Sequence, residues 1–213
     1  MNKNKNVILA IERMPQWAFL LILLLFQFIF VPQGLDFADE GFFMTFYQQI
    51  FNDPESVTYA FMYWFTGILG GTVYSLFPGG GILMMRFAGV LIITLTAAVT
   101  CRVLKSYLPL WAIRIGVAMS VLYIFDDVIS LYYNNVSALL YVTAVGLLLK
   151  GLRSGVGRGW IMGSGMLFSL NIFTRIPNIL GILFTLIILY EAWIFHRGMK
   201  WCVRNIVYFL SGY

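Results

Sequence analysis

The sequence predicts an all-α, polytopic membrane protein, and three observations lead to this fold class. Of the 213 residues, 61% are hydrophobic and only 11% are charged, which is far from the composition of a soluble domain. Apolar runs long enough to cross a bilayer as helices recur along the chain. Lys and Arg gather in connections that are separate from those holding most of the acidic residues.

We expect a membrane-spanning helix at each long apolar run, since a helix needs about 20 apolar residues to cross the hydrocarbon core. No A-x-A-like cleavage site follows the first run, which we therefore interpret as an uncleaved span. The last run is short, so we expect a partial span and a chain truncated at its C-terminal end. The result is a single transmembrane module over 1–213, with spans at about 15–32, 82–101, 108–125, 131–149, 159–174 and 176–195 and a partial span at 201–213.

The distribution of charge predicts how these spans are oriented. Eleven of the fourteen basic residues form four clusters, which the positive-inside rule places in the cytoplasm. Seven of the nine acidic residues lie in two connections without Lys or Arg: Asp36, Asp39, Glu40, Asp53 and Glu55 in the first, Asp126 and Asp127 in the second. We expect a multi-pass protein of the plasma membrane, the inner membrane of a bacterium, with these acids on the external or periplasmic face. No long basic patch is present, so no nucleic-acid partner is expected.

This alternation of charge requires that the apolar run 58–77 does not cross the membrane. The run ends at Pro78-Gly79-Gly80-Gly81, which is compatible with an interfacial or re-entrant helix. The preceding stretch 39–52 places five large apolar side chains on one side of a helical wheel and polar side chains on the other. We therefore expect two interfacial helices, at about 39–52 and 58–77, in the first external loop.

Several short motifs, taken in order, resemble those of the GT-C membrane glycosyltransferases, such as protein O-mannosyltransferases and aminoarabinose transferases. The most specific is Asp39-Glu40-Gly41-Phe42, which opens the first interfacial helix. The others are Met85-Arg86-Phe87, Asp126-Asp127, Tyr133-Asn134-Asn135 and Thr174-Arg175-Ile176-Pro177-Asn178. The resemblance covers most of the chain in loose pattern and implies a GT-C-like helical bundle.

The resemblance also implies a function and site residues. It implies transfer of a hexose or pentose from a polyprenyl-phosphate donor to a lipid, glycan or protein acceptor at the external face. Asp39, with Glu40 beside it, takes the catalytic position, and Asp126 or Asp127 takes the second acidic position. No cofactor is certain; some family members need a divalent metal and others do not, so metal use stays open.

The chemistry of glycosyl transfer points to the same groups. A carboxylate can accept the proton of the acceptor hydroxyl, and a fixed cation can stabilise the departing phosphate. Arg175, the only basic residue in an external connection, is a candidate for that phosphate, with a headgroup anchor or an ion pair as the alternative. Arg86, one turn inside its span, requires a partner: an acid such as Asp39, Glu40 or Asp126, or the donor phosphate itself. Arg114 is expected to snorkel to the interface.

Weaker candidates and alternative functions remain. Asp36, Asn134 and Asn178 are candidates to line the cavity, although the amides are more typical of hydrogen bonds between helices. Intramembrane charges also fit a transporter or flippase of a lipid-linked or small polar substrate, but that class usually shows internal repeats, and none is evident here. A non-catalytic membrane fragment is the third alternative.

Overall fold

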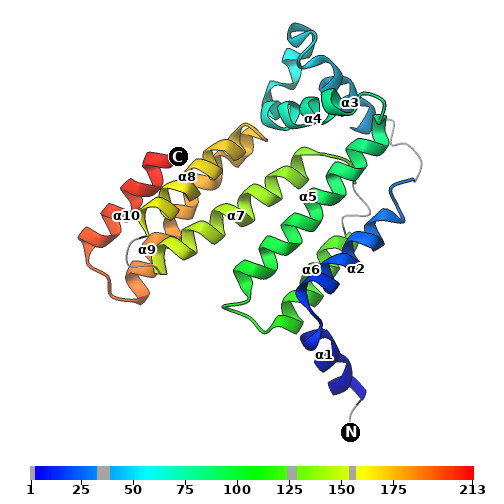
Figure 1. The fold of residues 1–213 in the computed structure, drawn as a ribbon. Helices are drawn as coiled ribbons and strands as arrows, with labels where there is room; N and C mark the ends of the chain where they lie inside the picture. Colours follow the sequence, from blue (N-terminus) through cyan, green and yellow to red (C-terminus); the bar gives the residue numbers. More distant parts are fainter. Residues whose placement is uncertain (1–2, 33–38, 124–128, 154–156) are drawn as a thin grey trace. The chain divides into compact units, whose positions relative to one another are not determined.

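The computed structural model describes residues 3–32, 39–123, 129–153 and 157–213, and every regular element in these ranges is helical. Figure 1 shows the helices along the chain. The chain divides into two compact units, unit 1 (1–60 and 66–139) and unit 2 (61–65 and 140–213), which are described separately. The elements are α1 Lys3–Arg13, α2 Gln16–Phe28, α3 Asp39–Gln49, η1 Pro54–Tyr63, α4 Trp64–Leu76, α5 Gly81–Leu104, α6 Leu110–Tyr123, α7 Tyr133–Arg153, α8 Arg158–Ile172, η3 Ile176–Phe184, α9 Thr185–Ile194 and α10 Met199–Gly212.

Helices α2, α5 and α6 form the core of unit 1. Phe19 and Leu23 of α2 pack with Ile93 and Ala97 of α5 and with Val117 of α6 in one buried apolar cluster. Many large side chains on the same helices remain exposed, such as Leu91 and Leu95 of α5. An apolar outer surface of this kind is what a helix presents to lipid.

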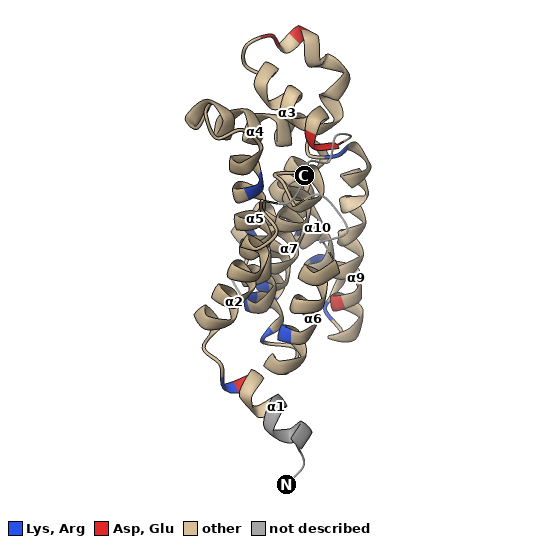
Figure 2. Cartoon of the chain, turned by 90° about the vertical axis from the view of Figure 1, so that its right-hand side faces the viewer, with Lys and Arg blue, Asp and Glu red and all other residues tan. Residues whose placement is uncertain are grey.

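Helices α3 and α4 pack closely and lie across one end of α5 in unit 1 (Figure 1). The close approach depends on glycines of α4, because a Cβ at Gly67 would meet Phe46 at 2.3 Å and one at Gly70 would meet Tyr47 at 2.3 Å. Phe46 and Tyr47 of α3 are therefore buried against the surface of α4 at two positions where glycine leaves no side chain. The described acidic residues of unit 1, apart from one near the end of α1, lie around α3 and the loop after it (Figure 2).

Unit 2 is built around α8 and α10. The part of α7 from residue 140 onward, η3 and α9 also belong to this unit and pack beside them. Helices α8 and α10 touch backbone to backbone, since a Cβ at Gly165 would lie 2.1 Å from the carbonyl oxygen of Phe209. Phe168 and Phe209 are completely buried at the centre of this unit. The expected partial span over 201–213 is the helix α10.

Among the residues that the structure describes, three helical stretches are long and apolar enough to cross a membrane: Gly81–Leu104, Tyr133–Arg153 and Ile176–Ile194. They correspond to the expected spans 82–101, 131–149 and 176–195. The expected spans 15–32, 108–125 and 159–174 give shorter helices of 13, 14 and 15 residues. Helix α2 starts directly after Pro15 and α6 directly after Pro109. Proline disfavours the helical conformation at the residue before it, so neither helix extends further toward the N-terminus.

The run 58–77 begins as a 3₁₀ helix and continues as an α-helix. Its first part belongs to η1, whose non-helical residue Val57 lies just before the run, and its second part is α4, which follows directly. With 13 residues, α4 is about 20 Å long, less than the roughly 30 Å hydrocarbon core of a bilayer. Its interfacial position in a membrane stays a prediction.

The expectation that Arg114 snorkels is wrong. Its side chain is buried, with 2% of the residue exposed, and its Nη1 donates hydrogen bonds to the carbonyl oxygens of Ile11 and Glu12 at the end of α1. The guanidinium also lies over the ring of Phe19, 5.6 Å from its centroid. Arg114 thus caps the last turn of α1, where unpaired carbonyls attract a cation.

A short irregular segment before α7, residues 129–132, runs against the first turns of α5. The backbone N–H of Leu131 donates to the carbonyl oxygen of Met85 at 2.9 Å. The approach requires Gly89, since a Cβ there would lie 2.0 Å from the carbonyl oxygen of Ile129. This contact fixes the position of Ser130.

The substitution Gly89→Ala is therefore expected to destabilise the protein by about 1–3 kcal/mol, because the methyl group overlaps backbone atoms that cannot rotate away. Gly116→Ala on α6 is the matched control, since a Cβ there meets nothing within 4 Å and should leave stability unchanged or slightly higher. Thermal unfolding of both variants in detergent measures the difference. Equal melting temperatures would contradict the close approach at Gly89.

Candidate functional site

A buried ion pair between Glu40 and Arg86 lies at the centre of the candidate site. The Nε–H of Arg86 donates to Oε1 of Glu40 at 2.8 Å, and Nη2 donates to Oε2 at 2.5 Å. Only 7% of the Arg86 side chain and 4% of the Glu40 side chain are exposed. This two-point geometry is the strongest that an arginine and a carboxylate adopt. The acidic partner that the sequence required for Arg86 is therefore Glu40.

The ion pair connects three segments of unit 1. Arg86 comes from α5 and Glu40 from α3, and Nη1 of Arg86 donates to the carbonyl oxygen of Val31, beyond the end of α2, at 2.9 Å. The hydroxyl of Ser130 donates to Oε1 of Glu40 and joins the segment before α7 to the same carboxylate. The two carboxylate oxygens thus each accept at least one hydrogen bond, which offsets the cost of burying the charge.

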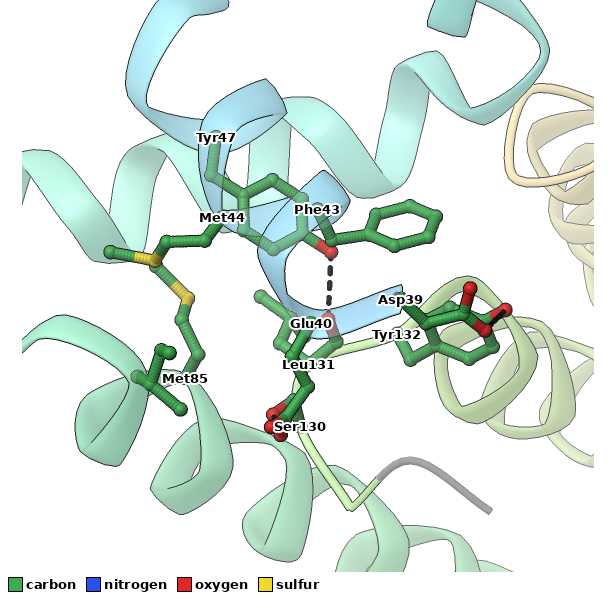
Figure 3. Close-up of a pocket in the computed structure, with 10 residues that line it drawn as sticks. Asp39, Glu40, Phe43, Met44, Tyr47, Met85, Ser130, Leu131 and Tyr132 are labelled. Carbon is green, nitrogen blue, oxygen red and sulfur yellow. Dashed lines mark hydrogen bonds between the residues drawn. The ribbon is translucent and has the colours of Figure 1, made fainter. Parts of the chain in front are cut away.

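Asp39 points away from Glu40 and has a different partner. Figure 3 shows Asp39 beside Tyr132 on one side of the site and Glu40 beside Ser130 on the other. The Tyr132 hydroxyl donates to Oδ2 of Asp39 at 3.1 Å. Asp39 is half-buried whereas Glu40 is buried, so of the two carboxylates it is the one that solvent or a substrate can reach. Both stand in the first turn of α3, where the helix dipole favours negative charge.

Tyr47 of α3 fixes the segment that carries Ser130 by a hydrogen bond to its backbone. Its hydroxyl donates to the carbonyl oxygen of Leu131 at 2.7 Å, the dashed line of Figure 3. Burial raises the pKa of Tyr47 well above its usual value, so the phenol remains a protonated donor at any physiological pH. Phe43 stacks edge-on against Tyr132, with ring centroids 4.8 Å apart. These contacts hold the first turns of α3 against the segment that carries Ser130 and Tyr132.

Both carboxylates line a small pocket of unit 1 together with apolar side chains of α3 and α5, including Met44 and Met85 (Figure 3). The pocket leaves about 10 Å³ for the centres of water molecules, which is close to the minimum for a single water. Three predicted site residues, Asp36, Asp126 and Asp127, lie outside the described residues. Their segments adjoin the pocket in sequence, at Asp39 and at Ser130.

The remaining predicted residues belong to other places in the fold. Arg175 is an exposed residue of unit 2, where the chain turns from α8 into η3, so its convergence with Asp39 stays a prediction. Asn178 is buried and donates from Nδ2 to Asn171 at the end of α8, at 3.0 Å to O and 3.1 Å to Oδ1. It therefore links η3 to α8, as expected of an amide between helices. Asn134 is half-buried in the first turn of α7.

Within the described ranges, no group of three or more His, Cys, Asp or Glu residues is placed to hold a metal ion. Asp36, Asp126 and Asp127, the other acidic candidates, lie outside those ranges.

Three contributors to the site were missed from the sequence: Ser130, Tyr132 and Tyr47. Ser130 and Tyr132 come three and five residues after Asp127, around the start of the expected span 131–149. A polar side chain next to an acidic connection was the available signal. Tyr47 is the only tyrosine of α3, but the sequence does not show which group its hydroxyl contacts.

No protein-family model, curated protein or solved structure matches this chain in the three comparisons. The fold and the candidate site therefore rest on the sequence and the structure alone.

Removing one member of the ion pair should be far more harmful than removing both charges. We expect Arg86→Gln to destabilise the protein by about 3–5 kcal/mol, because it leaves the Glu40 carboxylate buried without its cation. The double variant Arg86→Gln with Glu40→Gln should recover a large part of this loss. A double-mutant cycle on thermal unfolding in detergent measures the coupling. Additive effects of the two single substitutions would show that the pair is not coupled.

Proposed function

We propose that the chain belongs to an integral-membrane glycosyltransferase that moves a sugar from a polyprenyl-phosphate donor to an acceptor at the external face of the membrane. The observation that carries the proposal is that two adjacent carboxylates have different environments. Glu40 is neutralised by Arg86 and buried, while Asp39 is accessible and held by a neutral donor, Tyr132. The resemblance of Asp39-Glu40-Gly41-Phe42 to the GT-C motif supports the same assignment.

In the proposed reaction Asp39 acts as the general base. The acceptor hydroxyl oxygen attacks the anomeric carbon of the sugar, and its proton passes to the Asp39 carboxylate. The bond between that carbon and the phosphate oxygen breaks, and the polyprenyl phosphate leaves with the electron pair. Glu40 is a positioning residue in this scheme, because its ion pair fixes the start of α3 and so the place of Asp39.

The negative charge that develops on the leaving phosphate needs a cation. Arg86 is committed to Glu40, which leaves Arg175 as the candidate from the sequence analysis. Its guanidinium can bind phosphate oxygens in bidentate geometry. A divalent metal held by the acidic connections would serve the same purpose, and the sugar and the acceptor stay unassigned.

One observation favours a second candidate function, a non-catalytic membrane module. The pocket beside Asp39 accommodates about one water, which is far less than a sugar needs. In such a module the contacts of Asp39 and Glu40 would only tie the connections of unit 1 together.

A transfer assay distinguishes the two. The full-length protein in liposomes is supplied with polyprenyl phosphate carrying a radiolabelled hexose or pentose, and labelled acceptor and free polyprenyl phosphate are measured. We expect Asp39→Asn to lower the transfer rate by about 10²–10⁴-fold, since general-base catalysis contributes that much. Tyr132→Phe should have a smaller effect, because it removes one hydrogen bond to the base.

The matched control is Asp53→Asn, the same change at an exposed aspartate of the same external segment, which should leave the rate unchanged. Transfer that survives Asp39→Asn would refute the role of Asp39 as base. Absence of transfer by the unmodified protein with both donors would favour the non-catalytic module.

A further inference from the structure

The turn between α9 and α10 forms an open hollow in unit 2 that the proposed function does not use. The hollow has a volume of about 430 Å³, and its lining includes Leu189, Trp193, His196, Arg197 and Met199. All of these residues belong to the end of α9, the turn itself or the start of α10. The hollow is thus made by one local stretch of chain.

The hollow lies at the end of a membrane-spanning stretch. The apolar helical stretch Ile176–Ile194 has nine residues in 3₁₀ and ten in α conformation, which corresponds to about 33 Å and so to the thickness of the hydrocarbon core. Trp193, at its end, is 72% exposed, as is typical of the aromatic residues found at the level of lipid headgroups. The turn that follows is therefore at headgroup depth.

The charge of the hollow is positive. Arg197 contributes a guanidinium that lies 5.4 Å from the ring centroid of Trp201 and 6.0 Å from that of Phe195, and Lys200 follows three residues later. Glu191, the nearest carboxylate in sequence, is not among the residues that line the hollow. An arginine held in place by aromatic rings is well suited to bind phosphate oxygens.

The turn is closed by a residue in an unusual conformation. The backbone N–H of His196 donates to the carbonyl oxygen of Trp193 at 3.3 Å, and that of Arg197 donates to Ala192 at 2.8 Å. This is the Schellman pattern, in which the residue at the position of His196 is usually glycine. His196 adopts φ 48°, a conformation that is unfavourable for a side chain and common at functional sites. His196 is one of the residues that line the hollow.

An apolar stripe leads from the hollow along α9. Leu186, Leu189 and Trp193, at spacings of three and four residues, share one face of the helix and are 56%, 46% and 72% exposed. Two of them also line the hollow. A stripe of this kind offers an acyl chain a surface next to the cationic hollow.

We propose that this turn binds one anionic phospholipid, with the phosphate in the hollow on Arg197 and His196 and an acyl chain along the stripe of α9. The positive charge favours a lipid over a second copy of this chain, since two copies joined symmetrically here would bring their Arg197 and Lys200 side chains together. This inference is independent of glycosyl transfer.

Native mass spectrometry of the full-length protein in detergent tests the proposal, with dioleoylphosphatidylglycerol and dioleoylphosphatidylcholine as probes. Both lipids carry the phosphate, but choline adds a cation that Arg197 repels. We therefore expect one phosphatidylglycerol to be retained at least about tenfold more tightly than phosphatidylcholine, which corresponds to about 1.4 kcal/mol. Arg197→Gln should remove this preference. Arg204→Gln, the same change at an exposed residue of α10 outside the hollow, should alter the affinity less than twofold.

His196→Gly separates lipid binding from folding. Glycine suits the backbone of the turn, so the melting temperature should stay the same or rise, while the affinity for phosphatidylglycerol falls severalfold. Four results would overturn the proposal: equal binding of the two lipids, equal effects of Arg197→Gln and Arg204→Gln, unchanged affinity in His196→Gly, or a lipid-free dimer that Leu186→Gln splits into monomers.

Discussion

The ion pair between Glu40 and Arg86 is the constraint on which the candidate site depends. A charge buried at the end of a membrane helix must be neutralised locally, and Arg86 obtains this from a residue 46 positions earlier in the chain. The same guanidinium holds Val31, and the same carboxylate holds Ser130. Val31, Glu40 and Ser130, which come from three separate segments of the chain, are thereby brought to one place in unit 1.

This arrangement gives two neighbouring carboxylates different chemical roles. Glu40 is committed to a buried network, in which a missing partner is costly, while Asp39 has one neutral donor and an accessible surface. The close contacts around them have the same purpose, since Gly89 admits the segment of Ser130 and the glycines of α4 admit α3. The backbone is packed tightly so that one aspartate stands at a defined position.

The sequence predicted the elements whose signal is local. The runs 82–101, 131–149 and 176–195 agree with helices of spanning length because each is apolar and free of proline beyond its first residues. The sequence limited the acidic partner of Arg86 to a few candidates, because a buried arginine in a membrane helix requires a nearby negative charge. Ser130 and Tyr47 were missed, since their hydrogen bonds to Glu40 and Leu131 depend on the tertiary fold. Arg114 was predicted wrongly because its partners are backbone carbonyls of α1, which no sequence pattern reveals.

The proposed role of Asp39 requires that the acidic connections of unit 1 lie on the external face, opposite the basic turn after α5. The most direct test is labelling of Gly79→Cys and Ser106→Cys, two exposed positions that bracket α5, with a membrane-impermeant maleimide. In intact cells position 79 should be labelled, and position 106 should react only after permeabilisation. Labelling of position 106 but not 79 in intact cells would place Asp39 in the cytoplasm and contradict the account.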